Sequence, residues 1–185
     1  MNARNAGRLI GVAGAAAAGV LAGLTIGRAR KTAAKAVMRL HGDWVGQLES
    51  EHGAIKKMLR EMVSADVAEP VKRVALLEKV ADALTRHAVE EENVIYPAMR
   101  RAGMDGQVDA LFEDHARMKT LLDELRELSP EDASWTRRAR ALKKLVYRHV
   151  RKEEGELFPR LKDQMADAGR ERLTKLVRRE GARVG

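Results

Sequence analysis

The residues with the clearest chemical potential are histidines that have glutamates close beside them. The segment "TRHAVEEENVIYPAMR" places His87 four residues before Glu91, and "YRHVRKEEGELFPRLK" places His149 four residues before Glu153. Residues four apart lie on one face of a helix, so each imidazole and its carboxylate can bind one ion or flank a pair of ions. The predicted chemistry is therefore metal binding by nitrogen and oxygen donors.

The same arrangement occurs twice in the chain. "ESEHGAIKKMLREM" around His52 matches "FEDHARMKTLLDEL" around His115 at an offset of 63 residues, and the segments around His87 and His149 match at an offset of 62. A single helical histidine is usually a surface residue or a core residue, but a purely structural bundle has no reason to repeat the whole pattern. We therefore predict a two-metal centre with six ligands: His52, His87, Glu91, His115, His149 and Glu153.

The donor types narrow the choice of metal. Imidazole and carboxylate donors suit iron or manganese and also accept zinc. The chain has no Cys, which excludes thiolate metal sites, disulfides and a cysteine nucleophile. Open coordination positions would remain for solvent or a small ligand.

Helices must position these residues, and the composition favours helix. Aromatic residues make up 3% and there are four Pro, while Ala, Leu, Glu, Lys and Arg dominate. Apolar residues recur every three or four positions, no strand-like alternation is present, and Val74 is expected on an inward face. We predict an all-α fold, an antiparallel four-helix bundle, with helices over about 43–63, 71–100 and 107–128 and a fourth that starts at Ser129. A short, basic helix or tail is expected over 166–185.

The N-terminal segment differs from the rest of the chain. Leu9 to Ile26 is 18 residues without charge, which as a helix would span about 27 Å, close to the hydrocarbon thickness of a membrane. We predict that residues 1–40 form a hydrophobic segment ahead of a bundle over 41–165, and that residues 9–26 associate with a membrane. The basic flanks place the body on the cytoplasmic side, and the four-residue glycine spacing favours self-association. A cleaved signal peptide or a poorly ordered tail is the alternative.

The charge distribution argues against a nucleic-acid partner. The net charge is +8, but residues 1–40 contain seven basic residues and no acid. The other 28 basic and 27 acidic residues leave 41–185 at +1, with both signs mixed along the helices. No phosphate-binding glycine loop or nucleophile elbow is present, so no common enzyme signature is found, although redox catalysis stays open.

Four motifs resemble the hemerythrin-type HHE cation-binding domain over about residues 43–165. They are "EH" at Glu51-His52, "HAVEEENVIYP", "DH" at Asp114-His115 and "HVRKEEGELFP". The resemblance implies a non-heme di-iron site in a four-helix bundle, with the two iron ions oxo- or hydroxo-bridged and with manganese or zinc as alternatives. Carried over, it makes the four histidines imidazole ligands and the two glutamates of the predicted centre its bridging carboxylates.

The chain also departs from the oxygen-carrying hemerythrins. Those proteins have a second His one turn after the third-helix His, where this chain has Lys119, and the place after His52 is Lys56. Asymmetric coordination by five histidines, and with it a simple oxygen-carrier role, is therefore not expected. Those proteins also take a bridge from an acid five residues after the last His, which would select Glu154. The repeat favours Glu153 instead and leaves Glu154, with Glu92, to orient ligands or hold a proton.

We predict places or roles for four other residues. Glu90 is expected to face water. Tyr147 is a candidate to modulate redox chemistry, with core packing as its more ordinary role, and Tyr96 is a second tyrosine of interest. His41 lies about three helical turns before His52, some 16 Å along an axis, which is too far for the same centre.

Three functions fit these patterns. The first is a di-iron protein that binds or senses a small ligand such as oxygen, nitric oxide or peroxide. The second is iron storage or handling. The third is a membrane-tethered helical interaction module in which the metal only stabilises the bundle.

Overall fold

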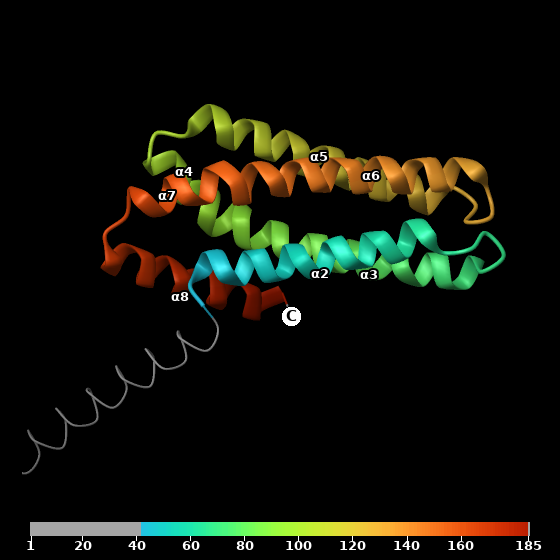
Figure 1. The fold of residues 1–185 in the computed structure, drawn as a ribbon, viewed down its shortest axis with the longest axis horizontal. Coiled ribbons are helices and arrows are strands. Elements are labelled where there is room, and N and C mark those ends of the chain that lie inside the picture. Colours follow the sequence, from blue (N-terminus) through green and yellow to red (C-terminus); the bar gives the residue numbers. More distant parts are fainter. Residues whose placement is uncertain (1–41, 185) are drawn as a thin grey trace, which may run out of the picture. The chain divides into compact units, whose positions relative to one another are not determined.

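The computed structural model describes residues 42–184, and within this range the chain is helical and contains no strand (Figure 1). The predicted segment 9–26 and His41 lie outside the described residues. No helix in the described range is both long enough and apolar enough to cross a membrane. The elements are α2 (Trp44–Ser64), α3 (Pro70–Glu90), η1 (Glu91–Ile95), α4 (Tyr96–Arg101), α5 (Asp105–Glu127), α6 (Ala133–Lys152), η2 (Glu153–Leu157), α7 (Phe158–Asp163) and α8 (Asp167–Val184).

Two of the long helices, α2 and α6, are capped at their N-termini by an aspartate. The carboxylate of Asp43 accepts a hydrogen bond from the Gly46 amide at 3.2 Å, and Asp132 accepts one from the Ser134 amide at 2.8 Å. Such caps satisfy amides that have no partner within the first turn. The expected start of the fourth helix at Ser129 is therefore wrong, because Asp132 is the capping residue and the helix begins after it.

The four long helices α2, α3, α5 and α6 pack side by side as a bundle (Figure 1). α2 contacts α3 and α6, and α5 contacts α6 and α3. Their apolar faces form two buried clusters, one nearer the α2–α3 and α5–α6 turns and the other nearer α4, α7 and α8. Along α2, Leu48 belongs to one cluster and Ile55 to the other, with buried His52 between them. The predicted metal ligands thus lie in a polar layer between two apolar ones.

The second helix is turned slightly from the expected orientation. Val74 was expected inside but is 45% exposed, and Arg73 is buried in its place. The guanidinium of Arg73 lies 4.2 Å from the ring centroid of Trp135 and donates hydrogen bonds to the carbonyl of Pro130 and the hydroxyl of Thr136. The cation–π contact and these hydrogen bonds make it favourable to bury the charged side chain, which a hydrophobicity pattern does not predict.

The C-terminal helix has about the expected bounds, and it packs against the bundle. α8 contacts α2, α3 and η1, and it buries Leu173 and Val177 among the residues of the second apolar cluster. The hydroxyl of Thr174 accepts a hydrogen bond from the amide of Trp44 at 3.1 Å, within the first turn of α2. α8 is therefore a fifth helix fixed to the bundle.

Candidate metal centre

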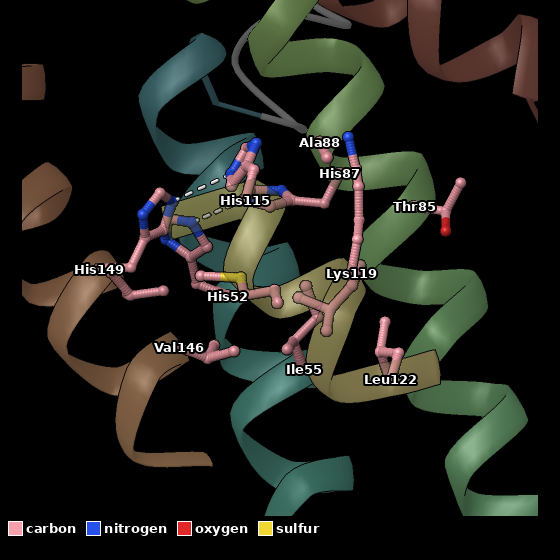
Figure 2. Close-up of a pocket in the computed structure, with 13 residues that line it drawn as sticks. His52, Ile55, Thr85, His87, Ala88, His115, Lys119, Leu122, Val146 and His149 are labelled. Carbon is pink, nitrogen blue, oxygen red and sulfur yellow. Dashed lines mark hydrogen bonds between the residues drawn. The ribbon is translucent and has the colours of Figure 1, made fainter. Parts of the chain in front are cut away.

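Four buried histidines, one from each long helix, point their Nε2 atoms toward one another (Figure 2). The Nε2 atoms of His52 and His87 are 2.8 Å apart, and those of His115 and His149 are 3.2 Å apart. Two ring nitrogens that face each other can share only one proton, so such a pair is well suited to binding a cation between its members. The structure thus brings together all four histidines predicted from the sequence.

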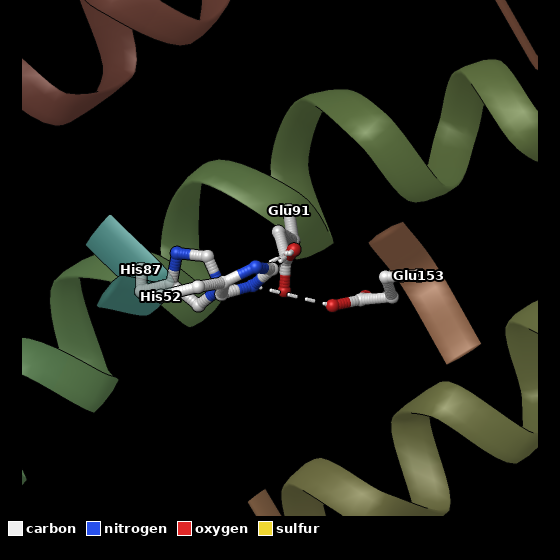
Figure 3. Close-up of side chains that lie close together, drawn as sticks. All are labelled: His52, His87, Glu91 and Glu153. Atoms are coloured by element: carbon white, nitrogen blue, oxygen red, sulfur yellow. Dashed lines mark hydrogen bonds and ion pairs between the residues drawn. The ribbon is translucent and has the colours of Figure 1, made fainter. Parts of the chain in front are cut away.

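The two predicted glutamates lie in the same layer (Figure 3). Both side chains are fully buried. Glu91 Oε1 is 3.3 Å from His87 Nε2, and its Oε2 is 3.4 Å from His115 Nε2. Glu91 therefore faces both histidine pairs with one carboxylate oxygen each.

Glu153 also lies between the two pairs. Its Oε2 is 3.4 Å from His52 Nε2 and 3.3 Å from His149 Nε2. Two groups of residues have donor atoms close enough together to hold an ion: His52, His87, Glu91 and Glu153 form one, and Glu91, His115 and His149 form the other. Glu91 belongs to both groups and Glu153 to the first, and which residues ligate stays a prediction.

The carboxylates have hydrogen-bonding capacity left over. Among residues 42–184, Glu91 Oε1 and Glu153 Oε2 are buried oxygens that accept no hydrogen bond. Buried carboxylate oxygens without partners are costly in a folded protein. Imidazole nitrogens and carboxylate oxygens are ligands of iron, manganese and zinc, so the donor set fits a pair of such ions.

Each histidine has a second acidic residue behind it, and for three of the four the carboxylate lies within hydrogen-bond distance of Nδ1. Nδ1 of His52 lies 2.9 Å from Glu154, that of His87 3.0 Å from Glu51, and that of His115 2.9 Å from Glu92. Nδ1 of His149 lies 3.5 Å from Asp114. A carboxylate that accepts the Nδ1 proton directs Nε2 at the metal and makes it a stronger ligand.

This arrangement separates the roles of the adjacent glutamates. Glu153 points into the centre, whereas Glu154 lies outside it against His52 Nδ1. Glu92 has the equivalent outer place beside His115. The expectation that Glu92 and Glu154 orient ligands matches these positions, and Glu51 and Asp114 complete the set.

The two lysines that replace histidines bind these outer carboxylates. Lys56 Nζ lies 3.3 Å from Glu154 Oε1, and Lys119 Nζ lies 3.1 Å from Glu92 Oε1. Each lysine therefore compensates the charge of a carboxylate that holds a histidine. Neither lysine points its ammonium group at the centre.

A π-helical turn follows each His-x-x-x-Glu pair. η1 begins at Glu91 and η2 at Glu153, and each is followed within two residues by a proline, Pro97 or Pro159. π-turns are rare and occur mostly at functional sites. Each turn is wider than an α-helical turn, and the next residues continue as a helix, so the prolines do not end the ligand helices.

Tyr96 places a hydroxyl in the centre, which the sequence pattern did not predict. Its buried hydroxyl lies 3.1 Å from His115 Nε2, 3.3 Å from Glu91 Oε2 and 3.3 Å from Glu153 Oε1. Tyr147, the candidate to modulate redox chemistry, is outside the centre: it accepts a hydrogen bond from Arg60 and donates one to the Lys56 carbonyl. The signal for Tyr96 was its position nine residues after His87, directly before the proline.

The expectation for Glu90 is wrong, because this residue is buried. Its side chain is 4% exposed and accepts a hydrogen bond from Gln47 Nε2 at 2.9 Å. Gln47 also donates to Glu51, the acceptor of His87 Nδ1. α8 covers Glu90, with Gly181 against its carboxylate, and a pattern taken from one helix cannot show that cover.

Opposite charges in the centre stabilise one another. Burial alone would raise the pKa of Glu91, but the charge of His87 and hydrogen bonding by His115 outweigh it and hold that pKa well below its usual range. Burial alone would lower the pKa of His87, but Glu91 and Glu51 raise it to about 10. A metal ion that binds here must therefore displace protons from the histidines.

Comparisons with known proteins agree with this geometry. A sequence model described as the hemerythrin HHE cation binding domain matches residues 45–161. A DNA nickase from Nostoc sp. is 28% identical over 119 residues, which are 64% of this chain and 33% of that protein, so the chain spans about a third of the relative's length. A crystal structure of a hemerythrin HHE cation binding domain-containing protein from Mycobacterium kansasii matches with a TM-score of 0.67 at 20% identity, over 77% of this chain and 86% of that one. The last match shows a common fold, and the resemblance predicted from the sequence is confirmed: the chain belongs to the hemerythrin HHE cation-binding domain family.

Proposed function

We propose that this protein is a non-heme di-iron protein that binds or senses a small ligand such as oxygen or nitric oxide. The observation that carries the proposal is the buried layer in which four Nε2 atoms and two shared carboxylates converge. The ligands would be the six residues predicted from the sequence: His52, His87, Glu91, His115, His149 and Glu153. Bound iron supplies redox chemistry and positions for a small ligand.

The residues around the centre support a small, uncharged ligand. A cavity lies beside the four histidines, and its other walls are mostly the apolar side chains of Ile55, Leu84, Met118, Leu122, Val146 and Val150 (Figure 2). The space open to the centres of water-sized molecules is about 30 Å³, room for one or two water molecules or a diatomic molecule. Apolar walls favour oxygen and nitric oxide over peroxide, which needs hydrogen-bonding partners.

Tyr96 supplies a proton donor on the opposite side of the layer. Burial and the negative charges of Glu91 and Glu153 raise the pKa of its hydroxyl well above the ordinary value, so it stays protonated at neutral pH. Its hydroxyl can therefore donate a hydrogen bond to a carboxylate or to a group bound between the two histidine pairs. The fully buried site keeps bulk water away from that hydrogen bond.

Metal analysis and spectroscopy of the purified chain test this proposal. We expect about two irons per chain after anaerobic reconstitution, and a visible spectrum that changes on exposure to oxygen or nitric oxide. Replacing Glu91 or Glu153 with Gln should each lower metal occupancy, whereas Glu156→Gln, on the exposed side of the same turn as Glu153, should not. A chain that binds no transition metal after reconstitution would refute the centre.

Iron storage is less well supported than ligand binding. A mineral core needs a large polar compartment, and the cavity beside the histidines is small and mostly apolar. A chain that binds two irons but shows no spectral response to either gas would favour handling of the metal over sensing.

One observation favours a second role as an interaction module. Val67, Val71 and Val74 are 50%, 82% and 45% exposed and follow one another at helical spacing over the α2–α3 turn and the start of α3. This end of the bundle is opposite α4, α7 and α8 (Figure 1). If the valines bind a partner or a second copy of the chain, Val71→Glu should weaken that association in sedimentation experiments without changing metal content.

We also infer that nucleic acid is not a partner of the bundle and that the body of the protein functions in the cytoplasm. The near balance of 28 basic and 27 acidic residues over 41–185 supports the first inference, although a relative that is matched over a third of its length is a DNA nickase. A DNA-binding and nicking assay at low salt tests it. Fusions to a compartment-specific reporter test the second inference and the membrane association of residues 9–26.

A further inference from the structure

The cavity beside the histidines opens between α3 and α5. Most of its walls are buried, but two of the residues that line it are exposed, Thr85 on α3 and Lys119 on α5. An exposed residue that lines a cavity marks the place where the cavity meets solvent. Figure 2 shows Lys119 extended from α5 toward α3, with the histidine rings to one side of it and Thr85 to the other.

Lys119 is held in this extended position by an ion pair. Its Nζ lies 3.1 Å from Glu92 Oε1, and the same oxygen lies 2.9 Å from His115 Nδ1. The lysine side chain is 61% exposed, so its aliphatic stem covers the cavity while its ammonium group remains in contact with water. One carboxylate oxygen thus connects the exposed lysine to a predicted metal ligand.

The other repeat contains a counterpart that does not line the cavity. Lys56 contacts Glu154, whose Oε1 lies 2.9 Å from His52 Nδ1, so the lysine, glutamate and histidine follow one another in the same order. Lys56 is only 24% exposed and is not among the residues around the cavity. The two lysines therefore share an electrostatic role, but only Lys119 lies across the opening.

We propose that Lys119 is a gate that controls the access of small molecules to the centre, which deepens the proposed function and rests on it. With the Glu92 ion pair formed, the stem closes the opening between α3 and α5. Ion pairs at exposed positions are weak, and exposed side chains change rotamer rapidly, so the gate opens by thermal motion of one side chain. When the gate opens, the small size of the cavity and its apolar walls select uncharged molecules of two or three atoms.

Two substitutions separate the gate from the electrostatics. Lys119→Ala removes the stem and the charge at the opening, and Lys56→Ala removes the equivalent charge without altering the cavity. Nitric oxide association with the ferrous chain, followed by stopped-flow absorption, should be roughly two- to sixfold faster in Lys119→Ala, the range that a weak exposed ion pair can sustain. Lys56→Ala should associate at the wild-type rate, and Lys119→Arg, which keeps a long stem and a cation, should stay close to it.

A readout that needs no iron keeps the gate testable if the proposed function fails. Xenon enters small apolar cavities, and its exchange can be followed through the methyl signals of Met118 and Leu122 in the NMR spectrum of the zinc-loaded or metal-free chain. We expect faster xenon exchange in Lys119→Ala than in wild type or Lys56→Ala. Equal effects of the two alanine variants, or no effect of Lys119→Ala on either rate, would overturn the gate. Absence of iron binding with altered xenon exchange would overturn only the proposed function.

Discussion

Replacing Gly181 with Ala should destabilise the protein, although Ala favours helix more than Gly does. A Cβ atom at position 181 would lie 2.3 Å from Glu90 Oε1 and 3.0 Å from its carboxyl carbon. Contacts this short do not occur, so the carboxylate of Glu90 has to move. That group is buried and accepts the hydrogen bond from Gln47, so its displacement breaks this hydrogen bond.

The sign of the effect depends on the relative size of opposing contributions. Ala in place of Gly within a helix gains at most about 1 kcal/mol. Overpacking against the Glu90 carboxylate costs about 1–3 kcal/mol, and loss of the Gln47 hydrogen bond about 0.5–1.5 kcal/mol more. We expect a net loss of about 2 kcal/mol, which lowers the melting temperature by roughly 4–8 °C for a chain of this size.

Gly169 is a matched control on the same helix. A Cβ there would meet only Met165, at 3.4 Å, which is an ordinary contact, so Gly169→Ala should be neutral or stabilising. Thermal unfolding followed by circular dichroism measures both variants. In a Glu90→Ala background the short contact is gone, and Gly181→Ala should no longer destabilise. If Gly181→Ala is as well tolerated as Gly169→Ala in the wild-type background, α8 does not pack tightly against Glu90, and the inference that α8 holds Glu90 in place is wrong.

Three further predictions concern the centre. Glu154→Gln should weaken metal binding by about 10- to 100-fold. Asp114→Asn should weaken it less, because Asp114 Oδ2 lies 3.5 Å from His149 Nδ1, whereas Glu154 Oε1 lies 2.9 Å from His52 Nδ1. Competition with a chelator ranks the two variants. Metal affinity should rise between pH 6 and pH 9, by up to about tenfold per pH unit for each proton displaced. The pKa of His87 is raised to about 10, so the imidazole carries a proton in this range that the metal must remove. An affinity independent of pH would contradict this protonation state. Tyr96→Phe should make the two iron environments more alike in a Mössbauer spectrum, and an unchanged pair of signals would show that the hydroxyl does not distinguish them.

The repeat made much of this structure predictable from the sequence. The two halves carry the same residue types at matching positions, such as His52 with His115 and Glu91 with Glu153. Such a match predicts that these side chains come together in the folded protein. The helical faces followed from periodicity for the same reason, since burial repeats every turn.

The features that sequence reasoning missed depend on contacts between elements or on irregular backbone. Arg73 is buried because Trp135 and two acceptors lie opposite it, and Glu90 is buried because α8 covers it. Neither partner can be found from the helix that carries the residue. The π-turns are a second cause, because an argument based on 100° per residue fails once the turn widens, and Tyr96 comes directly after one of these turns.

The near-symmetry of the two halves also shows where the two metal positions differ. Tyr96 and Phe158 occupy equivalent places, each directly before its proline. The Tyr96 hydroxyl contacts His115. The Phe158 ring instead stacks on the His52 ring, with the centroids 6.0 Å apart and an interplanar angle of 7°, and brings no polar group. Of the four histidines the hydroxyl contacts His115, and it also contacts Glu91 and Glu153, which face both pairs. The proposed gate residue is connected to the same histidine, because Glu92 contacts both Lys119 and His115. A duplicated scaffold can supply two equal positions; we expect one hydroxyl and one exposed lysine, both next to His115, to make the ligand chemistry of the two proposed positions unequal.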